Sequence, residues 1–444
     1  MAYWGEAMTY NEPVWFAQDF NSARAALKRL PATAPTERER AYLAAVEILY
    51  GEGTKEHRDF EYATAMRRLH EKYPDDHEAA AFYALSLLGT CHRGRDFRTY
   101  MKAAAIAEAV LEKNPEHPGA LHYAIHSYDD PIHAPLGLRA ARAYANVAPA
   151  AAHALHMPSH IFFAVGMWDE AARSNDDAWK ASQSRQPIES GGYHALWWLQ
   201  YTYLQQGRFA DARRVLETME QMTAAQPSSL LRFHLAQMRA MYSIETGEPQ
   251  RAGINVSDIE LPARAANLLA AGTNALNRGR RQDAESSLAA LRNLKPSAAA
   301  HDSHHGHVYQ DDVQAVAIME NQLAALLLMA DGKSKEAIEL MKKAVATEDK
   351  TPYEFGPPMP PKPVHELLGE MLLSSGRPDL AHVQFELALL RAPKRALSLL
   401  GLARSFAQSG NKAEAREVYD ELRNMWSRAD PEILKALEES MSRL

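Results

Sequence analysis

Apolar residues recur at the spacing of one helix face through most of the chain, in stretches that end at short turns containing glycine. Spacings of three and four residues are typical of an amphipathic α-helix, whereas strict alternation would indicate a β-strand. Alanine and leucine dominate these stretches and runs of β-branched residues are scarce, which also favours helix. The pattern predicts an all-α protein with far more helix than an average globular domain and essentially no sheet.

A short motif recurs along the chain, namely a glycine followed five residues later by an alanine. An apolar helical stretch precedes each copy, and prolines follow two copies at the same offset, Pro296 after Gly279 and Pro393 after Gly376. Glycine adopts the left-handed conformation that ends many helices. The motif therefore predicts the turn inside a repeated helix pair, in the copies GMWDEA (166–171), GRFADA (207–212), GRRQDA (279–284), GKSKEA (332–337), GRPDLA (376–381) and GNKAEA (410–415).

The stretch PVHELLGEMLLSSGRPDLAHVQFELALLRAP (363–393) is the best copy of this repeat. It resembles the tetratricopeptide repeat (TPR), in which helix A, a glycine turn, helix B and a proline occupy about 34 residues. The small residues Gly369, Ala381 and Ala388 would let the two helices approach closely, and Gly376 would form the left-handed turn. The resemblance implies a TPR-type α-α superhelix, a right-handed solenoid of antiparallel helix pairs that bury their apolar faces against their neighbours.

Placing each turn glycine at position fifteen of the repeat gives every helix A a register. We expect one continuous solenoid with N-terminal helical or degenerate repeats (1–83), histidine-rich repeats (84–262) and C-terminal repeats (263–444). Extra residues at 186–192 and 298–317 predict loop insertions. The first helices of the repeats should begin near residues 84, 118, 152, 193, 233, 265, 318, 362 and 396.

A longer string of segments, from WGEAMTYNEP through HYAIHSYDDPIHAPLGLRAARAYA and HMPSHIF to GMWDEA, resembles a group of mostly uncharacterised bacterial TPR proteins. The resemblance spans most of the chain and implies the fold, but it implies no activity. In that group a further helix would precede MAYWGEA. We therefore expect a soluble bacterial protein that is cytoplasmic or, if the chain is a trimmed exported precursor, periplasmic.

Histidines gather on one face of the predicted solenoid. In TPR proteins, positions two, five, nine, twelve and thirteen of helix A point into the concave groove, as the resemblance implies. His153, His156 and His160 occupy positions two, five and nine of one repeat, and His122 and His126 occupy positions five and nine of the repeat before it. Because helices A of adjacent repeats run side by side, about 10 Å apart, the two pairs should converge.

Further residues extend this histidine set. Asp129 and Asp130 take positions twelve and thirteen, and His194 and His234 take position two of the next two repeats. Imidazole suits Zn, Cu, Ni and Fe(II), and carboxylates widen the choice towards iron or manganese. The sequence predicts a transition-metal site (Zn, Cu or Fe) in the groove, with Asp129 or Asp130 as catalytic base or extra ligand and with metal ligands drawn from His122, His126, His153, His156, His160 and His194.

Two functions are compatible with this groove. A bound metal would activate water or dioxygen for a small substrate, which would make the protein a metal-dependent hydrolase or oxidoreductase. The alternative is a non-enzymatic scaffold that binds a peptide or protein partner, as most TPR proteins do. Groove histidines also occur for structural reasons, since imidazole is tolerated in cores. The groove presents His and Asp, whereas peptide-binding grooves tend to present Lys, Arg and Asn.

Other groove positions carry aromatic and charged residues. Trp197 and Tyr201, at positions five and nine of their repeat, predict an apolar wall beside His194, whereas Trp198 is expected in the core. His234 is a further predicted groove residue. Towards the C-terminus the groove would present an exposed Arg–carboxylate pair or a site for a charged ligand. The charged positions there are Glu366, Glu370 and Arg404.

A second histidine cluster, HDSHHGHVYQDD, contains His301, His304, His305 and His307. It lies in a predicted insertion between repeats. Such tracts bind metal in some proteins, but a solvated loop is the simpler interpretation. A further alternative is that the segment folds over the groove as a lid and brings a histidine or Asp311 to the site.

Composition excludes several other classes of protein. The single cysteine, Cys91, excludes an internal disulfide and a cysteine-based metal site. The formal charge of −7 is spread along the chain, with no basic stripe for nucleic acid. We expect no apolar stretch long enough to cross a bilayer. The expected partner is a small molecule or a peptide in the groove, and the oligomeric state stays open.

Overall fold

The computed structural model describes residues 1–444 apart from 31–34, 185–186, 251–252, 295–308 and 354–355. Helices make up 74% of the described residues. Strand structure in this part of the chain is limited to one antiparallel pair of two-residue strands, β1 (Asn11–Glu12) and β2 (Ala17–Gln18). The prediction of an all-α protein with essentially no sheet is confirmed.

The chain forms two compact units. Most of the first is Met1–Asp129 with Pro135–Ala148, and the second consists of Asp130–Ala134, Pro149–Asp302 and Gln310–Leu444. The expected three-part division at residues 83 and 262 stays a prediction.

The first unit is built from helices that pack against their neighbours in sequence. Polar N-cap residues define where several of these helices begin, because the side-chain oxygen of each cap accepts a hydrogen bond from a free backbone N–H of the first turn. Thr36 caps α3 in a full capping box, Asp76 caps α5 and Asp96 caps α6. The helices are α1 (Ala2–Met8), α2 (Phe20–Leu27), α3 (Glu37–Leu49), α4 (Lys55–Lys72), α5 (His77–Leu88), α6 (Phe97–Lys113), α7 (Pro118–Tyr128) and α8 (Ala134–Val147), with a 3-10 turn at Pro13–Trp15.

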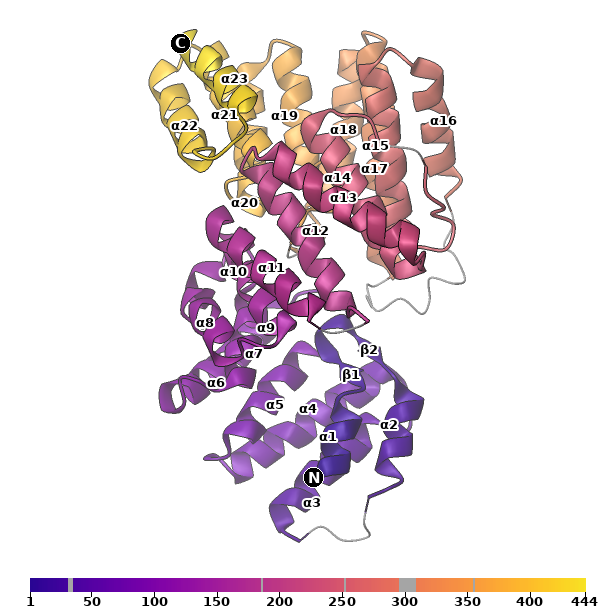
Figure 1. Cartoon of the computed structure of the whole chain (residues 1–444), viewed down its shortest axis with the longest axis vertical. Coiled ribbons are helices and arrows are strands. Elements are labelled where there is room, and N and C mark those ends of the chain that lie inside the picture. The colour runs from indigo at the N-terminus through magenta and orange to yellow at the C-terminus, as the bar shows by residue number, and fades with distance from the viewer. Residues whose placement is uncertain (31–34, 185–186, 251–252, 295–308, 354–355) are drawn as a thin grey trace. The chain divides into compact units, whose positions relative to one another are not determined.

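The second unit continues as successive helices joined mainly by short turns (Figure 1). Most helices pack on the next, and alternate helices such as α12 and α14 also touch, as first helices of adjacent repeats do. The helices are α9 (Ala152–His156), α10 (Pro158–Ala164), α11 (Trp168–Gln183), α12 (Ser190–Gln205), α13 (Phe209–Ala225), α14 (Ser229–Thr246), α15 (Leu261–Asn277), α16 (Arg281–Arg292), α17 (Tyr309–Ala330), α18 (Ser334–Glu348), α19 (Val364–Ser374), α20 (Pro378–Arg391), α21 (Ala396–Gln408), α22 (Lys412–Met425) and α23 (Pro431–Ser442).

The glycines of the repeated motif all adopt the left-handed conformation that the sequence predicts. Their φ angles are 68° at Gly166, 67° at Gly207, 69° at Gly279, 74° at Gly332, 70° at Gly376 and 83° at Gly410. A side chain at such a position would clash with its own backbone, which is why the turn favours glycine.

Small residues allow close helix packing where the sequence places them. Phe385 of α20 is fully buried, and a Cβ added to Gly369 of α19 would lie 2.9 Å from its ring. A Cβ added to Gly401 of α21 would overlap the same ring. Ala381 and Ala388 of α20 are also buried. One phenyl ring therefore fills the space that two glycines leave between three consecutive helices.

The predicted register is wrong in two repeats and incomplete in a third. The helix expected near residue 318 begins at Tyr309, so part of the insertion expected at 298–317 is helical. The helix expected near residue 84 begins at His77, because the Asp76 carboxylate accepts bonds from the backbone of Glu78 and Ala79 and starts the helix there. The helix expected from residue 152 is interrupted before Pro158, which lacks an N–H and begins the new helix α10.

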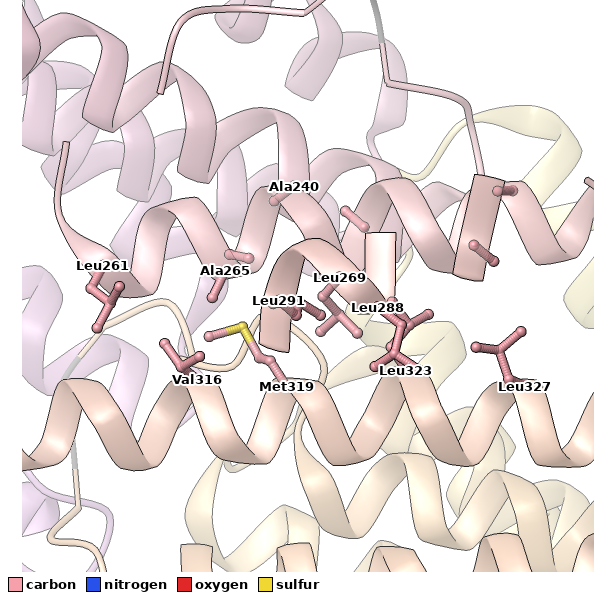
Figure 2. Close-up of a cluster of buried hydrophobic side chains, with 14 residues drawn as sticks. Ala240, Leu261, Ala265, Leu269, Leu288, Leu291, Val316, Met319, Leu323 and Leu327 are labelled. Atoms are coloured by element: carbon pink, nitrogen blue, oxygen red, sulfur yellow. The ribbon is translucent and has the colours of Figure 1, made fainter. Parts of the chain in front are cut away.

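One described helix, α17, is long and apolar enough over Asp312–Ala330 to cross a membrane by length and composition alone. The expectation that no such stretch exists was therefore wrong. Figure 2 shows Val316, Met319, Leu323 and Leu327 of α17 facing apolar side chains of α14, α15 and α16. Ile318 of the same helix belongs to a second cluster, formed with α18 and α19. Burial against these two clusters accounts for part of the apolar composition of this helix, since 39% of the apolar window is buried.

The second unit brings residues that are far apart in sequence into contact. The Trp168 indole donates to the carbonyl of Lys394 over 3.1 Å, and the Trp426 indole donates to the carbonyl of Gln205 over 2.9 Å. A Cβ added to Gly166 would lie 2.6 Å from Lys394, so this turn also permits the contact. The last repeats thus pack against the helices from α10 to α13.

A buried ion-pair network lies at this contact. Arg395 is 0% exposed, and its guanidinium donates to Glu366 (2.7 Å), to Glu245 (2.5 Å) and to the Tyr201 hydroxyl (2.9 Å). Lys362 lies 3.0 Å from the same Glu366. Burial by itself would raise the pKa of Glu366, but the positive charges of Arg395 and Lys362 outweigh burial and lower this pKa to about 2.

This network corrects the expected exposed pair. The arginine partner of Glu366 is Arg395 and not Arg404, which is exposed on α21 next to Tyr419. Glu370 pairs with Lys362 at 2.5 Å. The sequence predicted that Glu366 pairs with an arginine, but it predicted neither the right arginine nor the burial of the pair. Arg395 lies between α20 and α21, so the groove register does not include it.

The turn at Gly376 provides a test of the repeat architecture. Gly376→Val places a β-branched residue at φ 70° and should destabilise the second unit by at least about 1–2 kcal/mol. Gly253→Val is the control, because an added Cβ there meets no atom within 4 Å and the backbone is not left-handed. Thermal unfolding followed by circular dichroism checks both; equal melting temperatures for the two variants would contradict the role of the turn.

Removing the central cation tests the buried network. Arg395→Met leaves Glu245 and Glu366 buried without their main counter-charge, so it should lower the free energy of unfolding by about 3–5 kcal/mol. Arg404→Met changes an exposed arginine in α21, the helix that follows Arg395, and should cost at most about 0.5 kcal/mol. Urea unfolding monitored by tryptophan fluorescence measures both, and a small effect of Arg395→Met would show that the network is dispensable.

Candidate metal centre

Three histidines of the second unit gather at one point. His156 ends α9, His160 lies in the first turns of α10 and His194 lies near the start of α12. Each offers one ring nitrogen, and these three atoms all lie within 4.8 Å of one another. The Nε2 atoms of His156 and His160 are 3.2 Å apart. His156 is 2% exposed and His160 is 1% exposed, whereas His194 is partly exposed.

Local structure explains how these side chains meet. Although Pro158 ends α9, Met157 keeps helical angles (φ −52°, ψ −37°), so His156 and His160 retain the i,i+4 relation that places side chains on one face. Helix α12 packs against both α9 and α11, which brings His194 to the same face. The predicted groove register thus identified all three residues.

A buried asparagine orients the first histidine. Asn175 of α11 is 0% exposed, and its amide nitrogen donates to the carbonyl of Ala171 over 2.9 Å. Its oxygen is thereby turned to His156 and lies 2.7 Å from Nδ1. Nδ1 therefore carries the ring proton, and Nε2 presents a lone pair towards His160. Sequence reasoning missed Asn175 because it lies on the second helix of its repeat, which does not line the groove.

An indole covers the three histidines. Trp198 is 1% exposed; its ring stacks on His160 at 4.6 Å between ring centres and meets His156 edge-on at 4.8 Å and His194 at 5.3 Å. Phe163 lies behind it at 4.5 Å. The expectation that Trp198 is a core residue is confirmed. Imidazole binds metal in its neutral form.

A proline-rich segment, residues 356–363, also contacts the Trp198 indole; we call it the proline-rich strap. A Cβ added to Gly356 would overlap the Trp198 ring, so the strap backbone touches the indole directly. A cavity of about 100 Å³ lies between the strap and the aromatic rings of Phe163, Trp168 and Tyr201, away from the histidine nitrogens. The sequence signal for the strap was the run PPMPPKP, which the repeat analysis left unassigned.

The geometry suits a single metal ion. Bonds of 2.0–2.1 Å at tetrahedral angles place two ligand nitrogens about 3.3–3.4 Å apart, close to the separation observed between His156 and His160. A direct hydrogen bond between two neutral imidazoles has a similar length. Such a bond needs no third nitrogen nearby, whereas a metal ion does, and a His194 nitrogen lies within 4.8 Å of both.

The remaining predicted histidine ligands are divided between the two units. His153 belongs to the second unit and is exposed, with its ring centre 6.5 Å from that of His156. His122 and His126 belong to the first unit, where their rings are 4.8 Å apart and His122 stacks on Tyr144. The predicted convergence of these two residues with the histidines of the second unit stays a prediction.

The two candidate catalytic aspartates lie in polar surroundings. Asp129, in the first unit, is ion-paired with Arg95 and lies 3.2 Å from His126 Nδ1. Asp130, in the second unit, accepts bonds from the backbone N–H groups of Ile132 and His133 at 2.9 and 3.1 Å, and thereby caps the turn that follows. Their catalytic role stays a prediction. The histidines at 301–307 lie outside the described residues.

The aromatic wall beside His194 is present only in part. The ring centres of Trp197 and His194 are 5.9 Å apart, and Trp197 also meets His234 at 6.2 Å. Tyr201, in contrast, is fully buried and its hydroxyl is bonded to Arg395, so it belongs to the ion-pair network. Burial lowers the pKa of the His234 imidazole to about 4.

Comparisons with known proteins leave the activity open. No protein-family model and no curated protein matches this sequence. Among solved structures, the human IFIT1 dimer with m7Gppp-AAAA has 15% identity and a TM-score of 0.41 over 91% of this chain and 86% of that one. A tetratricopeptide repeat protein from Parabacteroides merdae has 14% identity and a TM-score of 0.34 over 66% of this chain and 98% of that one. Yeast Tom70 has 11% identity and a TM-score of 0.37 over 92% and 96%. The helix pairs and left-handed glycine turns of this chain give it a TPR-type fold.

Proposed function

We propose that the second unit binds one transition-metal ion through His156, His160 and His194. The observation that carries this proposal is the meeting of three ring nitrogens within 4.8 Å in a largely buried place, with Asn175 fixing the tautomer of one of them. Metal-bound histidines generally donate their other ring N–H to such a carbonyl oxygen, which orients the ring and raises its basicity.

The ligand set favours zinc, copper or iron(II) over harder ions, because all three donors are imidazole nitrogens. Three histidines with a fourth position left for water or substrate are the ligand set of a catalytic zinc site, whereas structural zinc sites close all four positions with protein ligands. We infer that the ion activates a water molecule for a small substrate. His194, as the partly exposed member of the set, marks the side from which such a substrate would enter.

Removal of the central ligand gives the first test of the site. His156→Ala should abolish stoichiometric zinc after dialysis, and with it the stabilisation that a saturating metal provides, about 2.7 kcal/mol at one hundred times the dissociation constant. Asn175→Ala should retain zinc with an affinity lower by about 10- to 100-fold. Metal per chain by elemental analysis, and melting temperature with and without a chelator, measure these effects.

His382→Ala is the matched control, since His382 of α20 stacks on Phe406 of α21 and belongs to none of the described histidine groups. It should leave the zinc content unchanged. If the folded His156→Ala protein holds as much zinc as the wild type, the proposed site is wrong, and the scaffold function becomes the better account.

The site also predicts a pH dependence. All three imidazoles must be unprotonated to bind, so zinc affinity should be constant at high pH and fall as pH drops through the histidine range, near ~6.5 for a free imidazole. Competition with a chromophoric chelator at a series of pH values measures this. An affinity that does not change between pH values well above and well below that range would contradict histidine ligation.

A further inference from the structure

The cavity of about 100 Å³ beside the proline-rich strap has few polar groups that a ligand could bind. Because proline has no backbone N–H, the strap offers few hydrogen-bond donors to it. The Trp168 indole donates to the Lys394 carbonyl, and the Tyr201 hydroxyl accepts from Arg395. Much of the wall is formed by the rings of Phe163, Trp168 and Tyr201 and by Pro358, Pro360 and Pro363 of the strap.

Glu348, the last residue of α18, contributes a carboxylate to the cavity lining. It is only 8% exposed, yet the one hydrogen bond of its carboxylate among the described residues is long, 3.4 Å from the backbone nitrogen of Val364 to Oε1. Burial raises the pKa of Glu348, and the charges of Arg391 and His365 lower it without outweighing burial. Buried carboxylates are normally paired or well hydrogen-bonded, so this one has accepting capacity that the protein leaves unfilled.

Arg391, the last residue of α20, contributes a cation to the same lining. Its Nη2 donates to the carbonyl and hydroxyl oxygens of Thr351 over 3.4 and 3.3 Å and to the carbonyl of Pro352 over 3.4 Å. These bonds are longer than the usual range of about 2.7–3.2 Å. Among the described residues, Nε and Nη1 make no hydrogen bond, and Arg391 forms no ion pair with Glu348. The guanidinium therefore retains donors for a ligand.

Two other polar side chains of the lining are occupied. The ring nitrogens of His365 lie 2.9 Å from the side-chain oxygen of Gln384 and 3.0 Å from the carboxylate of Asp349. The Thr351 hydroxyl donates to the backbone carbonyl of Glu348 over 2.7 Å. The cavity thus offers a ligand one negative and one positive group, and these two groups are not bonded to each other.

Size and charge together define the ligand. An apolar cavity of about 150 Å³ can hold benzene, so one of about 100 Å³ has room for roughly four to six non-hydrogen atoms. A small amine would satisfy Glu348 but would be repelled by Arg391, and a small carboxylate would satisfy Arg391 but would be repelled by Glu348. A zwitterion forms a charge-assisted hydrogen bond with each.

We propose that this cavity binds the zwitterion of a small α-amino acid such as glycine or alanine, with its ammonium group on Glu348 and its carboxylate on Arg391. The aliphatic part of the ligand then lies against the prolines and aromatic rings of the wall. This site does not rest on the proposed function, because none of its lining residues is a proposed metal ligand.

Isothermal titration calorimetry of the wild-type protein in the presence of a chelator tests the site with L-alanine and three analogues. Propionate lacks the ammonium group, ethylamine lacks the carboxylate, and propionamide has a donor and an acceptor without charge. L-alanine should bind at least about tenfold more tightly than each analogue, because each analogue loses at least one charge-assisted bond.

Two charge-removing variants should change the preference in opposite directions. Glu348→Gln keeps the size of the side chain and an oxygen for the Val364 N–H, and should weaken alanine binding about ten- to hundredfold while propionate binds as tightly as before or more tightly. Arg391→Gln should weaken alanine binding similarly, but it should spare or improve ethylamine binding. Glu386→Gln removes an exposed carboxylate of α20 outside the cavity and should change none of these affinities.

Circular dichroism first establishes that each variant is folded, and Glu348→Gln decides alone if Arg391→Gln does not fold. The proposal is wrong if the wild type binds no L-alanine at concentrations up to about 10 mM. It is also wrong if propionamide binds as tightly as alanine, or if folded Glu348→Gln protein binds alanine as the wild type does. A wild-type protein that binds alanine with the predicted preference but takes up no zinc would support this site and overturn only the metal site.

Discussion

The buried ion pairs of Arg395 fix the arrangement on which the second unit depends. One guanidinium joins Glu366 of α19, Glu245 of α14 and Tyr201 of α12, residues that are 29, 150 and 194 positions from it in the chain. Moving these charges out of water has a large desolvation cost, so such pairs add little net stability compared with apolar residues. We infer that their effect is on register, because sliding one of these helices along the others would separate Arg395 from a partner that it pairs with here.

The candidate metal centre depends on that alignment through α12. The same helix carries Tyr201 in the ion-pair network, and His194, Trp197 and Trp198 at the candidate site. Trp198 is held between the histidines and the proline-rich strap, whose Lys362 is in turn paired with Glu366. A shift of α12 by one residue would therefore unpair Arg395 and separate His194 from His156 at once. This connection is how a repeat scaffold, which is usually deformable, could hold ligands with the precision that metal binding requires.

Much of the fold could be predicted from the sequence because the signals are local. A turn glycine such as Gly376 follows from steric limits on φ within one residue, and the small side chains around Phe385 follow from the contacts inside a single repeat. The histidine stripe was found in the same way, since helical spacing and the repeat register place His156, His160 and His194 on one face. The start of α5 was misplaced because a strong cap at Asp76 decided it, against the register of the later repeats.

The parts that were missed depend on contacts between distant segments. Arg395 lies between two helices, and only folding of the whole second unit shows that it neutralises Glu245 and Glu366. Tyr201 was assigned to the groove because it occupies position nine of its repeat. The repeat register alone does not show that its hydroxyl is bonded to Arg395. Asn175 lies on a second helix, so a search restricted to first helices could not reach it. The apolar α17 was misjudged for a related reason, since its two buried faces belong to two different clusters.

X-ray absorption at the zinc edge of the zinc-loaded wild-type protein tests the central claim most directly, because it reports the ligand atoms themselves. The account predicts a four-coordinate ion with three imidazole nitrogens at about 2.0–2.1 Å and one further light atom, together with the outer-shell scattering typical of histidine rings. A spectrum of six oxygen ligands without imidazole scattering would contradict it, as would a protein that retains no zinc after gel filtration.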